Sequence, residues 1–157
     1  LSAYLEGEFY NHYDLVLIGH ENLKCKKFDE LYNSLDEALK ARILLNKTGV
    51  SQSDLFHFIK FSKAFIYPSL FEGFGIPPLE AAALKVNVIC SNLTAMKYFD
   101  FFNPFHIDPT VKNLKKSLKE VIKKNDDKRL TSIKNMVKKK YNWHNSAKKL
   151  YNFYDSV

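Results

Sequence analysis

Two glutamates flank a loop that is otherwise apolar and contains glycines. The stretch FIYPSLFEGFGIPPLEAAAL, residues 65–84, places Glu72 just before the glycines and Glu80 in an alanine-rich segment with helical character. One carboxylate can accept hydrogen bonds from two hydroxyl groups at once, and charge-assisted bonds of this kind contribute about 1.5–3 kcal/mol each. Each glutamate is therefore suited to hold a vicinal diol of a ligand.

The loop between the glutamates favours a ligand rich in hydroxyl groups. Gly73 and Gly75 lack a Cβ atom, so a ligand can approach the backbone closely and positive φ values are allowed. The amides of residues 73–76 can point at ligand oxygens, and the helix expected from Pro77 adds the positive end of its dipole. Pro77 and Pro78 remove two backbone donors, which makes a bare phosphate a poorer ligand. A nucleotide sugar fits, because its ribose and its sugar offer two diols separated by a diphosphate.

A simpler interpretation of the same residues stays open on spacing alone. Glu80, expected in the first turn of its helix, would complement the helix dipole, and Glu72 would be an exposed loop residue. Glutamate is common at both kinds of position.

The surrounding elements predict where this loop lies. Short apolar runs indicate strands at 14–19, 42–46, 64–68, 86–90 and 104–107. Helices are expected at 28–41, 54–61, 77–84, 92–99 and from 111 to the end, with breaks near 125–127 and 141–143. Alternating strands and helices predict an α/β fold with a Rossmann-like, doubly wound parallel sheet. Ligands of such sheets bind outside the carboxyl ends of the strands, which is where the loop after residue 68 must lie.

Composition limits the class of protein. The 157 residues, 46% apolar and 15% aromatic, predict one packed domain. The opening LSAYLEGEF resembles the middle of a helix rather than a signal peptide, which suggests a chain cut from a longer one. Cys25 and Cys90 form no disulfide framework, and the five histidines have no metal-ligand spacing. We expect a cytoplasmic, reducing setting and no bound metal.

Positive charge is concentrated late in the chain. The net charge is +7, and lysines crowd into the segments 112–124 and 134–149. They indicate either a solvated helix face or a patch that contacts an anionic membrane at its inner face. No nucleic-acid-binding motif accompanies them, so no nucleic-acid partner is expected.

The central motif resembles a known signature. PSLFEGFGIPPLEAAAL is similar to the Glu-x7-Glu motif of retaining glycosyltransferases of family 4, in the C-terminal half of the two-domain GT-B fold. Nearly the whole chain shares the likeness, through the further segments DLVLIG, VSQSDLFHFIKFSKAFIYPS, VNVICSN, HIDP and YNWHNSAKKLYNFY.

The resemblance implies a role for each matching residue. Glu72 would be the catalytic residue that contacts hydroxyls of the donor sugar near the reacting carbon, and Glu80 would bind the ribose diol. The other donor-binding residues would be the loop positions Gly73, Phe74, Gly75 and Ile76, and the strand-end positions Leu45, Asn46 and Lys47 within 44–47, which would border the nucleobase. The family needs no metal or cofactor besides its nucleotide sugar, retains the anomeric configuration and stabilises a diphosphate leaving group electrostatically.

The sequence departs from the family pattern at several points. Met96 and Lys97 stand where proline and glutamate are usual, and Lys85 replaces a glycine after the signature helix, which predicts a different helix exit. The first strand of the domain, its basic loop and the acceptor-binding domain have no counterpart in the sequence. Residues 1–157 are therefore expected to be a donor-binding domain truncated at its N-terminal end and inactive in isolation. Trp143 is expected to anchor the last helix in the core, and His20 to be a loop residue.

Three hypotheses follow from these residues. The first is the donor domain of an enzyme, a hexosyltransferase that builds a bacterial cell-surface polysaccharide, lipopolysaccharide or glycolipid. The second is a non-catalytic nucleotide-sugar-binding or scaffold domain, which the substitutions at Met96 and Lys97 favour and the presence of both glutamates opposes. The third is a basic module that docks on membranes. The nucleobase, the sugar and the acceptor are left open.

Overall fold

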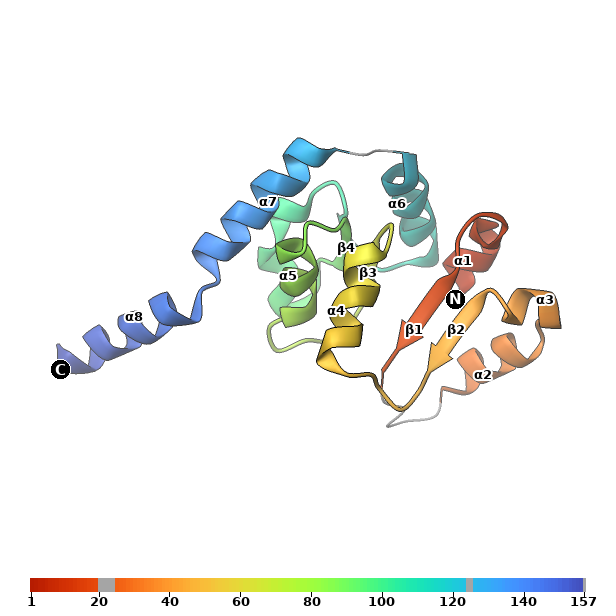
Figure 1. The fold of residues 1–157 in the computed structure, drawn as a ribbon, viewed down its shortest axis with the longest axis horizontal. Helices are drawn as coiled ribbons and strands as arrows, with labels where there is room; N and C mark the ends of the chain where they lie inside the picture. Colours follow the sequence, from red (N-terminus) through yellow and green to blue (C-terminus); the bar gives the residue numbers. More distant parts are fainter. Residues whose placement is uncertain (20–24, 124–125, 157) are drawn as a thin grey trace.

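The computed structural model describes residues 1–19, 25–123 and 126–156. His20, predicted to be a loop residue, and the last residue of the lysine-rich segment 112–124 lie outside these ranges. The elements, in chain order and as drawn in Figure 1, are α1 (Ser2–Glu6), η1 (Phe9–Asn11), β1 (Leu15–Ile18), α2 (Lys26–Asn33), α3 (Glu37–Lys40), β2 (Ile43–Asn46), α4 (Gln52–Phe61), β3 (Phe65–Tyr67), α5 (Ile76–Ala83), β4 (Val88–Ser91), η2 (Thr94–Tyr98), η3 (Asp100–Phe102), β5 (His106–Ile107), α6 (Val111–Lys123), α7 (Asp127–Lys140) and α8 (Trp143–Asp155).

All the described strand pairs are parallel. β1 pairs with β2, with Leu15 opposite Ile43. β4 lies between β3 and β5, with Tyr67 opposite Cys90 on one side and Cys90 opposite His106 on the other. The described strands therefore form a two-stranded and a three-stranded sheet. The predicted α/β class with parallel strands and covering helices is confirmed.

Helices cover both faces of β4, which is buried along its whole length. Val88 and Cys90 point into a core made with α4, α5 and α7, whereas Ile89 points into a second core made with α1, β2 and α6. Burial on both faces explains the uninterrupted apolar run of this strand. Cys90 packs as a small core residue, and its burial raises the pKa of the thiol to about 12.

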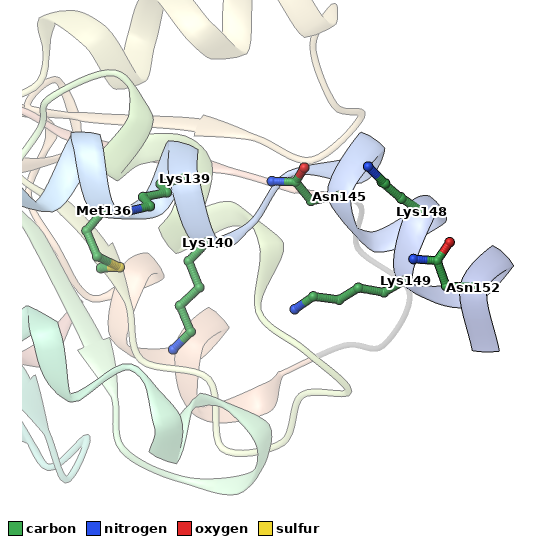
Figure 2. A pocket seen from close by; sticks show the side chains of 7 residues that line it. All are labelled: Met136, Lys139, Lys140, Asn145, Lys148, Lys149 and Asn152. Atoms are coloured by element: carbon green, nitrogen blue, oxygen red, sulfur yellow. The ribbon is translucent and has the colours of Figure 1, made fainter. Parts of the chain in front are cut away.

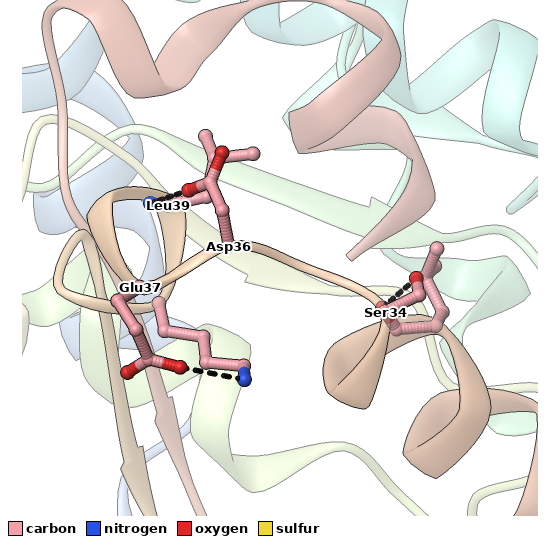
Figure 3. A network of polar contacts seen from close by, with 6 residues as sticks. Ser34, Asp36, Glu37 and Leu39 are labelled. Atoms are coloured by element: carbon pink, nitrogen blue, oxygen red, sulfur yellow. Dashed lines mark hydrogen bonds and ion pairs between the residues drawn. The ribbon is translucent and has the colours of Figure 1, made fainter.

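The prediction of a single helix over 28–41 is wrong. Figure 3 shows the break: the Ser34 hydroxyl donates to the Leu31 carbonyl at 2.8 Å after the end of α2, and the Asp36 carboxylate accepts from the Leu39 amide at 2.8 Å. Side chains of this type satisfy the backbone groups that a helix end leaves open. The same leucine periodicity is therefore divided between α2 and the short α3.

The end of α5 differs from its prediction as well. Lys85 has φ +67°, and its amide and that of Val86 donate to the Ala82 and Ala81 carbonyls. This is the Schellman arrangement, in which glycine is the usual residue at the left-handed position. The ammonium group of Lys85 pairs with Asp127 at 2.7 Å, linking the exit to the start of α7. The expectation of a different helix exit is wrong, because the lysine adopts the conformation that a glycine would take.

The last helix stands away from the rest of the domain (Figure 1). None of the residues of α8 is buried, and Trp143 is 84% exposed. The prediction that Trp143 anchors this helix in the core is therefore wrong; Tyr141, just before α8, packs against the core instead. Within the described residues, the helices are too short or too polar to span a bilayer.

Candidate functional site

The loop of residues 68–75 joins the carboxyl end of β3 to α5, and its last residue must be glycine. Gly75 has φ +93° and ψ +53° and precedes the first helical residue, Ile76. A Cβ atom at Gly75 would lie 2.7 Å from the Cγ atom of the fully buried Met96 and 3.2 Å from the ring of Phe99. Both the backbone conformation and the close packing exclude a side chain here. Gly75 thus fixes how the loop enters the helix.

Gly73 differs from Gly75, because its backbone conformation does not require glycine. Its φ is not in the left-handed region, since Gly49 and Gly75 are the described glycines with positive φ. A Cβ atom at Gly73 would meet nothing within 4 Å. The space above this backbone is therefore open, as close approach of a ligand requires.

Glu72 is held from two elements, through its carboxylate and through its backbone amide. The Tyr67 hydroxyl, at the end of β3, donates to Glu72 Oε1 at 2.7 Å. The Glu72 amide donates to Thr94 Oγ1 at 3.1 Å, and Thr94, in η2, has φ +50°. These bonds orient a half-buried side chain at the carboxyl end of the sheet, and its other carboxylate oxygen has no hydrogen-bond partner among the described residues and is available to a ligand.

Tyr67 stays protonated over a wide pH range. Burial, together with the hydrogen bond and the negative charge of Glu72, raises the pKa of Tyr67 from its ordinary value of 10.0 to about 12. The phenol therefore donates to Glu72 throughout the physiological range.

Glu80 lies deeper in α5 than its prediction placed it. It is the fifth residue of a helix that begins at Ile76, and the first turn contains no acidic residue. The predicted first-turn position is therefore wrong, and the interpretation of Glu80 as a dipole complement loses its basis. The side chain is half-buried and makes no hydrogen bond or ion pair within the described part of the chain. Its carboxylate is accordingly available to a ligand.

Aromatic packing supports the loop from one side. The ring of Phe74, 49% exposed, meets Phe99 and Tyr141 edge-on at centroid distances of 6.1 and 6.0 Å. The phenylalanines that follow β4 pack in the cores, since Phe99, Phe102 and Phe105 are buried and Phe101 packs against them partly buried. Ile76, 47% exposed, keeps an apolar surface beside the loop.

The predicted nucleobase contacts lie at the end of the other sheet. Leu45 and Asn46 end β2, and the Asn46 Oδ1 atom accepts from the Thr48 amide at 3.1 Å. The ammonium group of Lys47 lies 3.9 Å from a carboxylate oxygen of Asp29. The structure thus places the glutamate loop and the β2 end on two different sheets of the described chain.

Sequence reasoning missed the two residues that hold Glu72. Tyr67 could have been noticed as a polar group at the end of an apolar strand, five positions before the glutamate. Thr94 gave no signal, because its left-handed backbone and its bond to a residue 22 positions away depend on the tertiary fold. Of the residues that depart from the family pattern, Met96 fills the core beneath Gly75 and Lys97 lies 5.0 Å from the ring centroid of Tyr98.

The described residues offer no cluster of three or more His, Cys, Asp or Glu side chains that could hold a metal ion. The chemistry available at the loop is therefore that of carboxylates, backbone amides and one tyrosine. The expectation that no metal takes part remains a prediction.

Removing the tyrosine hydroxyl should weaken the fold in a pH-dependent way. We expect Tyr67→Phe to lower the free energy of unfolding by about 1 kcal/mol, the net value of a side-chain hydrogen bond. The folded chain keeps this phenol protonated up to about pH 12, whereas the unfolded chain releases the proton near pH 10.0. The difference between wild type and variant should be complete below pH 10 and disappear as the pH rises through about 12.

Urea unfolding at several pH values measures this difference, with Tyr151→Phe as the matched control. Tyr151 is 69% exposed, and its substitution by phenylalanine removes the same hydroxyl oxygen without removing a described hydrogen bond. Cys90 contributes its own decline of stability above pH 9.0 in every variant, so only differences between variants are compared. An equal effect of the two substitutions would contradict the account.

Substitution by alanine should lower the free energy of unfolding strongly at Gly75 and hardly at all at Gly73. Gly75→Ala is expected to lower the free energy of unfolding by about 2–4 kcal/mol, from left-handed strain and overpacking against Met96. Gly73→Ala should change it by no more than about 0.5 kcal/mol, as surface substitutions do. Thermal or chemical unfolding of both variants measures this, and a similar loss in both would show that the open space at Gly73 does not exist.

Comparison with known proteins is consistent with this geometry. Residues 5–143 match the family described as glycosyl transferases group 1. O-antigen chain mannosyltransferase B of Escherichia coli is 32% identical over 84 residues, which cover 54% of this chain and 21% of that protein. Serotype-specific mannosyltransferase WbdA of Escherichia coli is 28% identical over 120 residues, which cover 73% of this chain and 14% of that protein.

The chain thus spans about a fifth or less of the length of these curated relatives. The family match itself extends over most of the chain, from α1 to the start of α8, and includes both sheets and the glutamate loop. This chain belongs to the glycosyl transferase group 1 family.

Proposed function

We propose that this chain is the donor-binding domain of a retaining glycosyltransferase that uses a nucleotide diphosphate sugar. The observation that carries the proposal is the fixed Glu72, whose carboxylate accepts from Tyr67 and whose backbone amide donates to Thr94, beside the open backbone at Gly73. A carboxylate that is already oriented loses little further freedom when a sugar hydroxyl binds to it.

The parts of the donor correspond to separate groups on the protein. Glu72 Oε2 would accept hydrogen bonds from hydroxyls of the sugar, and the amides of residues 73–76 would face its oxygens at the start of α5. Glu80, which has no described partner, would accept from the ribose diol. The β2 end at residues 45–47 would border the base.

The reaction would depend on electrostatics at the start of α5. The bond between the anomeric carbon and the diphosphate oxygen breaks, and the electron pair leaves with the diphosphate. The acceptor oxygen then bonds to the same face of the anomeric carbon, and the proton of its hydroxyl passes to the departing diphosphate. The glutamate loop would position the sugar, and the positive end of α5 would favour the developing negative charge. We propose that this chemistry needs no metal.

The relatives guide the choice of sugar and product. Two of them are named as mannosyltransferases and one as acting on the O-antigen chain. We therefore propose that the transferred sugar is mannose and that the product is a cell-surface polysaccharide. The acceptor would bind to a second domain, since the segments that match this chain cover only 21% and 14% of these two relatives.

A non-catalytic donor-binding domain is the second candidate. Met96 and Lys97 replace the proline and glutamate expected in the turn after β4, and Met96 is buried beneath Gly75 rather than available to a ligand. Such a domain would bind the donor without transfer, so binding tests the shared part of both candidates.

Calorimetric titration of this chain with mannose and glucose diphosphates of uridine, guanosine and adenosine tests donor binding. We expect one base to be selected, and Glu80→Gln to weaken that binding about 10- to 100-fold, the value of one or two charge-assisted hydrogen bonds. Gly73→Ala should weaken it as well while leaving the free energy of unfolding unchanged, because the added methyl group occupies the open space.

Glu8→Gln is the matched control for these titrations. Glu8 is an exposed glutamate between α1 and η1, and its substitution removes the same charge away from the loop. An equal loss of donor affinity in Glu8→Gln and Glu80→Gln would contradict the proposed site. So would a donor affinity that neither Glu80→Gln nor Gly73→Ala changes.

A further inference from the structure

The short helix η2 makes two contacts on which the glutamate loop depends. Thr94, its first residue, accepts from the Glu72 amide at 3.1 Å, and Met96 packs beneath Gly75, where an added Cβ atom would lie 2.7 Å from Met96 Cγ. Thr94 has φ +50°, a conformation that β-branched residues rarely adopt and that persists only where neighbouring contacts impose it. The position of Glu72 therefore depends on the contacts that hold η2.

His106, in β5, bonds to η2. It lies opposite Cys90 in the register of β4 and β5, so its side chain is on the face of the sheet where Cys90 and Met96 pack. The Nε2 atom of His106 lies 2.9 Å from the Met96 carbonyl oxygen. Because a carbonyl oxygen only accepts, Nε2 must carry the proton and donate. The same oxygen accepts from the Phe99 amide at 2.9 Å, so both of its lone pairs are used.

Two grooves in the described part of the chain differ in their connection to η2. A groove of about 230 Å³ between β5 and α6 is lined by His106 and by polar groups that include Asn92, Asp108 and Lys116. Water in this groove can satisfy the Nδ1 atom of His106, which has no partner among the described residues. The groove of about 460 Å³ between α7 and α8, shown in Figure 2, has no lining residue with a described hydrogen bond or ion pair to η2 or to the glutamate loop. The polar groove at β5 is thus the one whose lining residue reaches η2.

We propose that His106 is a positioning residue for the donor site. Its bond to the Met96 carbonyl keeps η2 in the arrangement in which Thr94 can hold the Glu72 amide. The proposal rests on the proposed function, since Glu72 is the group that would bind the sugar of the donor. His106 has no described contact with Glu72, so it acts through η2. Without its bond, η2 adopts other arrangements more often, and the donor binds more weakly in proportion to the fraction of chains that lose the binding arrangement.

Hydrogen exchange of the Glu72 amide, followed by NMR without any donor, tests the positioning directly. We expect His106→Leu to speed up this exchange about 3- to 10-fold, the equivalent of one net hydrogen bond, because Thr94 then holds the amide less often. His106→Gln should restore the wild-type rate, since the amide nitrogen of glutamine can donate in place of the imidazole Nε2.

His12→Leu is the matched control for these measurements. His12 is exposed at the end of η1, and its side chain makes no described hydrogen bond. This substitution should leave the exchange of the Glu72 amide unchanged. Circular dichroism of each variant confirms that the domain is folded before the rates are compared.

Calorimetric titration with the donor that the wild-type chain selects gives the functional measurement. His106→Leu should weaken the binding about 3- to 10-fold, whereas His106→Gln should bind as the wild type does. Thr94→Val removes the oxygen that holds the Glu72 amide, so adding His106→Leu to it should weaken the binding little further. A general loss of stability would instead give additive losses in the double variant.

The outcomes separate this proposal from the proposed function. A wild-type chain that binds none of the donors would overturn the proposed function, and the exchange of the Glu72 amide would still decide whether His106 positions that residue. Selective donor binding that His106→Leu leaves unchanged would overturn the role of His106 alone. Equal losses in His106→Leu and His106→Gln, additive losses with Thr94→Val, or an unchanged exchange rate of the Glu72 amide in His106→Leu would overturn it as well.

Discussion

Both faces of β4 are packed, and the position of the glutamate loop depends on this packing. Val88 and Cys90 enter one core and Ile89 enters the other, so helices must lie on both sides of the sheet. β3 then lies beside β4 in a register that places Tyr67 opposite Cys90, at the carboxyl end of the pair. Because the faces are covered, this end of the sheet is where polar groups can meet a ligand.

The loop after β3 converts this position into a shaped site. Gly75 lets the chain enter α5 directly over Met96, and the Tyr67 hydroxyl and Thr94 hold Glu72 above the sheet. The glutamate is thus fixed by groups from β3 and from η2, which are brought together by the pairing of β3 and β4. The position of Glu80, one turn into α5, follows from where the helix begins.

Much of this arrangement could be predicted from the sequence. The strands are short apolar runs between helical patterns, and the positions of β1 to β5 follow from them because burial on a parallel sheet needs such runs. The loop and its two glutamates could be placed at the carboxyl end of β3 for the same reason.

Other features depend on contacts that a sequence pattern does not contain. The leucine spacing of 28–41 continues across a break that the Asp36 side chain creates. Lys85 occupies a position that usually needs glycine, stabilised by an ion pair with Asp127 far along the chain. Trp143 is of a residue type that is usually well buried, but the turn after Tyr141 directs α8 away from the domain. The bonds of Glu72 to Tyr67 and Thr94 likewise exist only once β3 and β4 have paired.

Hydrogen exchange of the backbone amides, with and without the donor selected by titration, tests the central claim most directly. The account predicts that the added protection is concentrated at residues 72–76, where the amides at the start of α5 face the ligand, with smaller changes near the end of β2. Protection confined to α7 and α8, or absent from residues 72–76 at saturating donor, would contradict the assignment of the glutamate loop as the donor site.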